Sequence, residues 1–391
     1  MKNNKSPLLF LVFSLIFIGI IFISISSLNE ANSTLGDKFF FIKKQTFWLI
    51  LGIICYYITS KIKMETVKKW SFLFYLISIL GLILVLIPGF GNQALGAKRW
   101  LNLGFTSIQP SEILKLSSII YFSYLFAKEE KRHLKNLIFY LGVPFLLIII
   151  EPNLSTAILI SAIVGSIYYI SGGDISSLLG MVVVILLLSI PLIFLSPYRS
   201  ARLKTFLEPQ QNQSGASYHS NQIILTLSSG GLFGKGFANS DQKYKFLPKI
   251  STDSILAVIG EEVGFIGIFV VLLIYLSLIN YLFKLSQTID DPFQKLLVSG
   301  TACWIAYQSL INISAIAALI PLTGIPLPFI SYGGSSLLTL FIAIGLVKNV
   351  EKNQKTLIYL ESDQYKNKKD NHHHRNPPNS SPRTHQAIAK R

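Results

Sequence analysis

An aspartate stands at the entrance of a strongly apolar segment of the chain. Asp253 lies in the sequence KISTDSILAVIGEE, residues 249–262, and two further acids, Glu261 and Glu262, follow it there. A charged side chain at the centre of a membrane-spanning helix costs at least about 2.5 kcal/mol, so such residues usually mark a substrate site or an ion path. The chemistry of the chain should therefore be sought around Asp253.

Asp253 also suits a structural role. An Asp at the start of a helix can cap the first turn and interacts favourably with the helix dipole. Thr252 or Ser251 could cap that turn equally well, which leaves Asp253 free for chemistry. Glu261 and Glu262 lie about two turns or more further into the segment, so we assign them to packing or to a polar network.

Two charged clusters precede this segment. Arg99, in the sequence GAKRWL, presents a planar fork of donors that suits phosphate, although Arg and Trp beside a bilayer are commonly simple anchors. In QPSEILK, residues 109–115, Glu112 and Lys115 are spaced to pair on one face of a helix. An ion pair alone would explain these two residues. Together with Arg99 they form a cationic pocket with one internal acid, which would suit a diphosphate.

A third polar segment, PLTGIPLPFISYGGSS, covers residues 321–336 and includes Ser331 and Tyr332. Its prolines and glycines forbid a continuous helix, so its backbone groups need partners in a protein-lined or wet cavity. Such a broken segment is typical of a binding site, and a tight external turn is the alternative.

A glycine-rich stretch, SSGGLFGKG, covers residues 228–236. Glycines beside a lysine can bring backbone N–H groups close to an anion. The Walker spacing fails, because Ser229 stands where its first glycine should be. A turn between two short amphipathic elements on the membrane surface is the favoured alternative to phosphate binding.

The composition places all these residues in a membrane protein. Hydrophobic residues make up 51% of the chain and charged residues 14%, and the mean hydropathy is +0.51, which excludes an ordinary soluble domain. We expect an all-α polytopic fold with about ten spans. They lie near 8–28, 46–61, 70–89, 111–127, 136–150, 154–171, 176–197, 253–283, 296–320 and 331–348.

Lysine and arginine placement predicts the orientation of these spans. If the N-terminus is cytoplasmic, the inside loops hold ten Lys or Arg residues: Lys61, Lys63, Lys68, Lys69, Lys128, Lys131, Arg132, Lys135, Lys284 and Lys295. The outside short loops hold fewer, which agrees with the positive-inside rule. Both termini are then cytoplasmic, and a large loop of about residues 198–252 faces outside together with Asp253.

The net charge of +16 does not indicate nucleic-acid binding, because the charges are spread over cytoplasmic loops and a tail where they suit anionic lipid head groups. We expect a membrane domain over residues 1–350 and a basic, disordered tail over residues 351–391. Cys55 and Cys303 fall inside predicted spans, where packing is their expected role.

The polar clusters, taken in order, resemble a known family. GAKRW, QPSE, EPNL (residues 151–154), SGGLFGKG, Thr252-Asp253, GEE and PLPFISYGGSS look like the shape, elongation, division and sporulation proteins, the FtsW, RodA and SpoVE group. The likeness runs over roughly residues 8–350. It implies a peptidoglycan glycosyltransferase of about ten helices that polymerises lipid II outside the bacterial cytoplasmic membrane and releases undecaprenyl diphosphate.

The resemblance also implies roles for residues. Asp253 matches the family's essential aspartate and becomes the candidate general base, and Arg99 and Lys115 are assigned to the donor diphosphate, with Glu112 orienting Lys115. The full set of expected substrate-binding residues is Arg99, Lys115, Glu112, Gln109, Ser111, Arg202, Ser331 and Tyr332. Asn153 and Ser155 depart from the family's usual Asp and Gly, which puts a charged role there in doubt.

The sequence leaves several alternatives open. VIGEE leans towards FtsW and PLTGIP towards RodA, with a slight preference for FtsW. By resemblance the partner is a class B penicillin-binding protein, a transpeptidase. A lipid II flippase is the main rival function and a scaffold that recruits the transpeptidase is the second. We expect no metal-ligand set and no definite cofactor, and whether a divalent cation, Mg²⁺ or Mn²⁺, is needed stays open.

Overall fold

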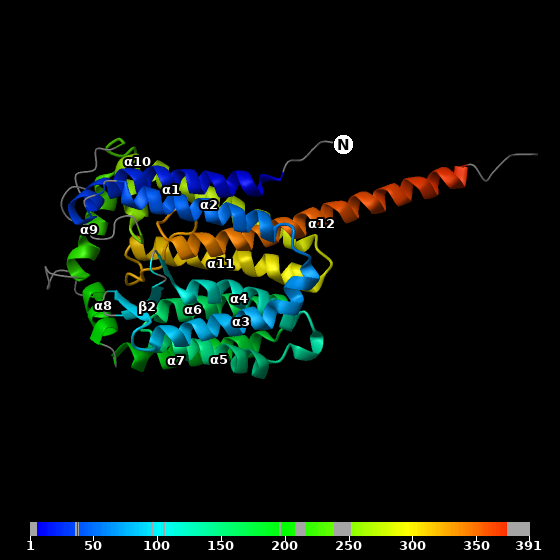
Figure 1. Ribbon diagram of the computed structural model, residues 1–391, viewed down its shortest axis with the longest axis horizontal. Helices are drawn as coiled ribbons and strands as arrows, with labels where there is room; N and C mark the ends of the chain where they lie inside the picture. The colour runs from blue at the N-terminus through cyan, green and yellow to red at the C-terminus, as the bar shows by residue number, and fades with distance from the viewer. Residues whose placement is uncertain are drawn as a thin grey trace, which may run out of the picture. The chain divides into compact units, whose positions relative to one another are not determined.

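The computed structural model of the chain is a bundle of helices with one small sheet (Figure 1). It describes residues 6–35, 37, 39–94, 97–102, 104, 106–194, 197–207, 216–237 and 252–373. The long helices are α1 (Pro7–Leu35), α2 (Phe40–Thr59), α3 (Met64–Leu86), α4 (Pro110–Phe126), α5 (Leu134–Ile150), α6 (Leu154–Ile170), α7 (Ile175–Phe194), α10 (Ile255–Gln287), α11 (Pro292–Ile316) and α12 (Gly334–His373). Two shorter helices, α8 (Pro197–Leu207) and α9 (Ala216–Ser229), and a 3-10 turn at Glu129–Lys131 complete the set.

Each expected span corresponds to one of the long helices, so the predicted helical membrane fold is confirmed. Seven helices within the described ranges are long and apolar enough to cross a membrane, and α4, α5 and α6 have 17 residues each. The chain is a multi-pass membrane protein. Buried and exposed faces differ strongly between helices: α4 buries nearly all its residues, whereas α7 has 6% of its apolar window buried.

Helix α11 is the centre of the bundle. It packs against α10, α6 and α4, and α4 in turn packs on α3. The connection from α11 to α12, residues 317–333, is irregular, as its prolines and glycines predict. It reaches deep between the helices, because a Cβ at Gly19, well inside α1, would come within 2.5 Å of the carbonyl oxygen of Ile330.

A small antiparallel sheet was not expected from the sequence. Strands β1 (Gly91–Ala94), β2 (Ala97–Asn102) and β3 (Ser107–Ile108) follow α3 in the order β1-β2-β3. Trp100 pairs with Asn92, and Leu101 pairs with Ile108. The strands are too short to show a clear alternation of apolar and polar residues in the sequence. Strand β2, which carries Arg99 and Trp100, contacts α4.

The glycine-rich stretch packs against a kink in α10. Gly264 has a φ of 75° and interrupts the helix. Four backbone hydrogen bonds replace those lost at the kink: Lys235 N and Gly236 N donate to the carbonyls of Glu261 and Glu262, and Phe265 N and Ile266 N donate to the carbonyls of Gly231 and Leu232. A side chain at Gly230 or Gly234 would overlap the α10 backbone. The glycines are therefore needed for close backbone packing.

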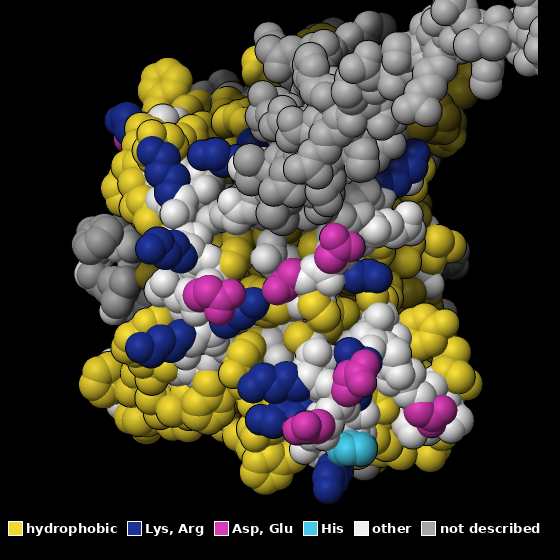
Figure 2. Space-filling model, turned by 90° about the vertical axis from the view of Figure 1, so that its right-hand side faces the viewer, with side chains coloured by type: hydrophobic (Ala, Val, Ile, Leu, Met, Phe, Trp, Pro, Cys, Tyr) yellow, Lys and Arg dark blue, Asp and Glu magenta, His cyan; other side chains and the backbone are white. Residues whose placement is uncertain are grey.

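Two ends of the bundle differ in their residues. The connections with the sequence-predicted cytoplasmic lysines lie at the right in Figure 1, and β2, α8 and α9 lie at the left. Figure 2 shows the right-hand end, where Lys and Arg side chains gather with a smaller number of acids. Asp253 lies at the opposite end, beside α8 and α9.

The chain divides into two compact units, Met1–Asn349 and Val350–Arg391. Residues 351–373 belong to α12, which ends at His373, and the disorder expected for the tail stays a prediction. This stretch contains no Gly or Pro, so nothing in it breaks a helix. Residues 374–391 lie outside the described residues, as do Lys249 and Ser251.

Candidate functional site

Asp253 occupies the turn before α10, and its backbone is held by α11. The side-chain amide of Asn312 donates hydrogen bonds to the carbonyl oxygens of Asp253 (2.9 Å) and Ile325 (2.8 Å). The N-cap of α10 is Ser254, and no side chain caps this helix start. The Asp253 carboxylate instead accepts a hydrogen bond of 3.1 Å from the Thr252 hydroxyl. Capping is therefore not the function of Asp253, and its half-buried carboxylate is available to a substrate.

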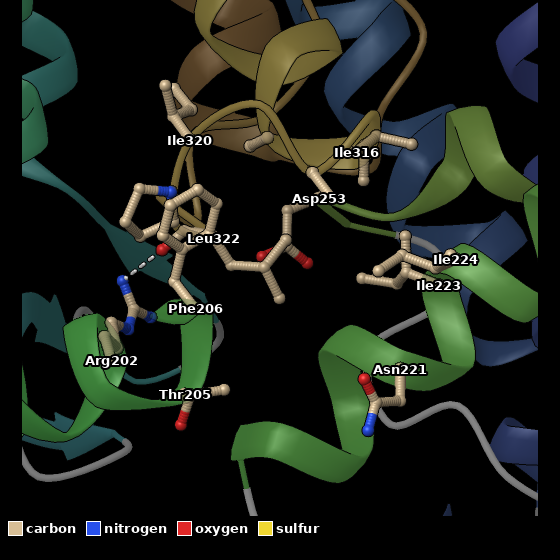
Figure 3. Close-up of a pocket in the computed structure, with 13 residues that line it drawn as sticks. Arg202, Thr205, Phe206, Asn221, Ile223, Ile224, Asp253, Ile316, Ile320 and Leu322 are labelled. Atoms are coloured by element: carbon tan, nitrogen blue, oxygen red, sulfur yellow. Dashed lines mark hydrogen bonds between the residues drawn. The ribbon is translucent and has the colours of Figure 1, made fainter. Parts of the chain in front are cut away.

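Two cavities meet at Asp253, and both contain it in their walls. We call the first, of about 490 Å³, the aromatic cavity; Lys44, Trp48, Trp100, Thr106, Ser107, Gln109, Glu112, Thr252, Gly324, Pro326, Tyr332, Gly333, Gly334 and Ser336 also line it. The second, of about 320 Å³, is the aliphatic cavity; Arg202, Thr205, Phe206, Asn221, Ile223, Ile224, Ala315, Ile316, Ala318, Ile320, Pro321 and Leu322 line it too. In Figure 3 Asp253 points into the space between α8, which carries Arg202, and α9, which carries Asn221.

Arg202 and Asp253 both lie close to Gly324. A Cβ at Gly324 would lie 3.7 Å from Asp253 Oδ2 and 3.9 Å from Arg202 Nη2. Arg202 also donates a 3.0 Å hydrogen bond to the carbonyl of Leu322, two residues before Gly324 (Figure 3). Gly324 has a φ of 71°, where a side chain would add strain as well as fill the space between acid and guanidinium.

A third cavity, of about 180 Å³, brings Arg99, Arg199 and Arg202 together next to Asn153 and Ser155. Arg99 donates to the carbonyls of Glu151 (3.2 Å) and Pro152 (2.5 Å). Arg199, from α8, donates to the carbonyl of Ile149 (2.6 Å). Both guanidinium groups thus bind the carboxyl end of α5, where cations interact favourably with the helix dipole.

Glu151 lies in the turn between α5 and α6 and is completely buried. Its carboxylate oxygens have no hydrogen-bond partner within the described part of the chain. Burial raises the pKa of this carboxyl to about 8, although the charge of Arg99 acts in the opposite direction. Asn153, the departure from the family pattern, accepts a 2.9 Å hydrogen bond from Thr156 and so stabilises the start of α6.

Lys115 does not line any of these cavities; the structure buries it between α4 and α11. Its ammonium pairs with Glu112 at 2.7 Å, donates to Gln308 at 2.7 Å and lies 5.2 Å from the Trp304 ring. The spacing predicted the ion pair correctly. It did not reveal Gln308, which lies 193 residues away and also donates to the carbonyl of Pro326. Lys115 is therefore placed to support the wall of the aromatic cavity.

The other expected residues fall into two groups. Gln109 and Tyr332 line the aromatic cavity, and burial raises the pKa of Tyr332 to about 12. Ser331 instead closes a turn by accepting from the backbone N–H of Leu327 at 2.9 Å. Ser111 is fully buried in α4 and away from the cavities.

Three residues of the site were missed. Lys44 and Trp48 line the aromatic cavity from α2, and Asn312 holds the Asp253 backbone. No local pattern distinguishes Lys44 from Lys43. An Asn inside the apolar helix α11 was a usable signal, because a polar side chain there needs a partner.

Among the described residues no three His, Cys, Asp or Glu side chains gather where they could hold a metal ion. Asp253 and Glu112 are the carboxylates that line the aromatic cavity.

Comparison with known proteins gives a consistent result. Residues 6–356 match the family described as cell cycle protein, FtsW/RodA/SpoVE. A probable peptidoglycan glycosyltransferase FtsW of Trichlorobacter lovleyi is 31% identical over 89% of this chain and 93% of the relative. Stage V sporulation protein E of Bacillus subtilis is 32% identical over 90% of this chain and 98% of the relative.

Two solved structures share the fold. One comes from work on the structural coordination of polymerization and crosslinking by a peptidoglycan synthase complex; it has a TM-score of 0.74 and 23% identity, over 90% of this chain and 99% of that one. The other is the rod shape determining protein RodA of Thermus thermophilus, with a TM-score of 0.65 and 23% identity, over 90% and 98% of the two chains.

Proposed function

The chain belongs to the FtsW/RodA/SpoVE family of cell cycle proteins, and on that premise we propose that it is a peptidoglycan glycosyltransferase that polymerises lipid II. The observation that carries this proposal is the position of Asp253, shared by two cavities and next to Arg202. A transferase for two lipid-linked sugars needs an acid–base group where both substrates meet. The names of relatives, such as probable peptidoglycan glycosyltransferase FtsW, support the same reaction.

In this reaction the Asp253 carboxylate takes the proton from the 4-hydroxyl of the acceptor GlcNAc. The hydroxyl oxygen forms a bond to the anomeric carbon of the donor MurNAc. The bond from that carbon to the phosphate oxygen breaks, and its electron pair leaves with undecaprenyl diphosphate. A cation beside the reacting carbon stabilises the charge that develops on the leaving group.

We assign that cation to Arg202, because its guanidinium and the Asp253 carboxylate both lie within 4 Å of one point at Gly324. A planar guanidinium can bind phosphate oxygens in pairs. This assignment replaces the expected roles of Arg99 and Lys115. Arg99 orders the turn after α5, and Lys115 with Glu112 positions the cavity wall.

The proposed location is the bacterial cytoplasmic membrane, with both termini in the cytoplasm and Asp253 outside. The lysine-rich end in Figure 2 then faces the cytoplasm. The proposed partner is a class B penicillin-binding protein, since a structure of the same fold comes from a peptidoglycan synthase complex that couples polymerization and crosslinking.

For the biological process we propose cell division. Several relatives of similar identity are named FtsW, including those of Trichlorobacter lovleyi and Geobacter sp.. Depletion of the protein from its host should give filaments with normal width. Rounded cells of increased width would instead assign the protein to elongation.

A lipid II flippase would use the same polar cavities, since broken segments and intramembrane charges are common in transporters. The aromatic and aliphatic cavities both lie at the Asp253 end of the bundle, which favours catalysis at one face. Purified protein with its transpeptidase partner should convert labelled lipid II into glycan polymer. Movement of lipid II across vesicle membranes without any polymer would reject the enzyme and favour the flippase.

A further inference from the structure

We infer that the aromatic cavity is the acceptor subsite and that Lys44 binds the diphosphate of the incoming lipid-linked disaccharide. This inference rests on the proposed glycosyltransferase function and adds to it, because it separates the two substrates. It also assigns a role to a lysine that the sequence motifs do not include.

The two cavities at Asp253 differ in the side chains that line them. The aliphatic cavity is lined mainly by Ile, Leu, Ala and Pro side chains, with Arg202 as its cation. The aromatic cavity is lined by two tryptophans, a tyrosine and several hydroxyl and amide groups, with Lys44 as its cation among the described residues. Each cavity thus offers one positive charge, and the two share one acid.

The proposed reaction involves two diphosphates, one on the donor and one on the acceptor, and they lie at different distances from the Asp253 carboxylate. The donor diphosphate is attached to the carbon that reacts, so its cation must lie beside Asp253, as Arg202 does. The acceptor attacks through its GlcNAc, and its diphosphate is attached to the next sugar. The acceptor cation must therefore lie in a cavity that contains Asp253 but on a different element, as Lys44 of α2 does.

The contacts of the Lys44 ammonium leave it able to bind an anion. Its ammonium lies 4.6 Å from the centre of the Phe40 ring, one turn earlier in α2, and no carboxylate pairs with it in the described part of the chain. The neighbouring Lys43 instead pairs with Asp37 at 2.9 Å. A half-buried ammonium at a cavity wall can form charge-assisted hydrogen bonds with phosphate oxygens.

The acids of the aromatic cavity do not prevent this binding. Glu112 lines the cavity, but the ammonium of Lys115, one turn later in α4, contacts its carboxylate at 2.7 Å and compensates its charge. Asp253 is the other acid, and an attacking hydroxyl must approach it in any case.

The aromatic walls suit the sugars that link the two ends of the acceptor. Trp and Tyr rings have an apolar face that can cover the C–H face of a sugar and a polar edge that can hydrogen-bond. Trp48 is buried and contacts the backbone at Gly334 so closely that a side chain there would overlap it. Tyr332 packs edge-on against Phe41 with the ring centres 5.2 Å apart. These rings are fixed before a substrate binds, which lowers the entropic cost of binding.

The test uses two substrate analogues, one that can act only as donor and one that can act only as acceptor. Lipid II with a galactose on its GlcNAc 4-hydroxyl can act only as donor, and a lipid II phosphonate with a carbon in place of the anomeric oxygen can act only as acceptor. The initial rate of formation of the galactose-capped pentasaccharide is measured with the purified protein and its transpeptidase partner, varying one substrate at a time. The variants are Lys44→Ala, Lys44→Arg and the matched control Lys43→Ala.

Lys44→Ala should raise the KM for the acceptor about 10-fold to 100-fold, the effect of losing a hydrogen bond to a charged group. The KM for the donor and kcat should change less than about 3-fold, because the interaction is not specific to the transition state. Lys44→Arg should recover most of the affinity, and Lys43→Ala should behave as wild type.

An increase in the donor KM, an equal increase in both KM values, or no change in Lys44→Ala would overturn the acceptor assignment. Wild-type protein that forms no pentasaccharide would reject the proposed reaction itself. Equilibrium binding of the phosphonate to Asp253→Asn protein then tests Lys44 separately, and equal affinity with and without Lys44→Ala would also overturn the inference.

Discussion

The side chain of Asn312 holds the backbone of Asp253 through a 2.9 Å hydrogen bond to its carbonyl oxygen. The same amide group binds the carbonyl of Ile325 at 2.8 Å, so one residue of α11 sets the distance between the turn that carries the acid and the segment that carries Gly324. The broken segment and the proposed base are therefore positioned by a common support.

We predict that Asn312→Ala lowers kcat for polymerisation about 100-fold, the effect expected when a catalytic group moves by about 1 Å. The KM for lipid II should change little, because Asn312 does not line either cavity at Asp253. Steady-state kinetics on the purified complex measure both constants. An unchanged kcat in a folded Asn312→Ala protein would show that Asp253 does not need this support.

The burial of Lys115 leads to a prediction about stability. Lys115→Met should destabilise the protein by about 3 to 5 kcal/mol, because the Glu112 charge would be left buried without its partner. The double variant Glu112→Gln with Lys115→Met should recover much of that loss. Thermal unfolding in detergent measures the two differences. A Lys115→Met protein with wild-type stability and weaker lipid II binding would restore Lys115 as a direct ligand.

The glycine packing at the α10 kink is also testable. Gly234→Ala should destabilise the fold by about 2 to 4 kcal/mol, since the new Cβ would overlap the Glu262 backbone at a residue with positive φ. The control is Gly180→Ala in α7, where the new Cβ meets nothing within 4 Å. That variant should unfold at the wild-type temperature or slightly above it. Equal unfolding temperatures for the two variants would contradict the packing role.

Glu151 predicts a pH dependence of stability. Its pKa is raised from the usual 4.5 to about 8, so between these values the folded protein holds a proton that the unfolded chain releases. This contribution is fully present below about pH 4.5 and is lost as the pH rises through about 8, with a slope of about 1.4 kcal/mol per pH unit.

Glu151→Gln should remove that slope and leave the protein more stable than wild type near pH 8. The measurement is the unfolding temperature in detergent at a series of pH values. Parallel curves for wild type and Glu151→Gln would mean that Glu151 is ionised in the folded protein.

Local sequence signals were sufficient for the spans, and they singled out Asp253, whose role as the base stays a prediction. The apolar lengths of helices such as α1 and α10 exceed what a soluble core needs, and the prolines and glycines of residues 321–333 excluded a helix there. Asp253 was recognisable in the sequence because a charged side chain next to an apolar span costs free energy and usually marks a functional site.

Long-range packing determined what the sequence could not predict. The Glu112–Lys115 spacing is the same whether the pair faces a substrate or a buried Gln308, and only the position of α11 distinguishes these cases. Lys44 lines the aromatic cavity because α2 packs beside the segment that leads to Gly334. The α10 kink depends on a stretch about thirty residues earlier in the chain, which no pattern within α10 indicates.

The most direct measurement compares polymer formation by wild-type and Asp253→Asn proteins, each with the transpeptidase partner and labelled lipid II. Asp37→Asn is the control, because Asp37 is a half-exposed carboxylate paired with Lys43 outside the cavities. Asp253→Asn should still bind lipid II but lose polymerisation by about 10²-fold to 10⁴-fold, the contribution of a general base. Polymer made by Asp253→Asn at the wild-type rate would contradict the assignment of Asp253 as the base.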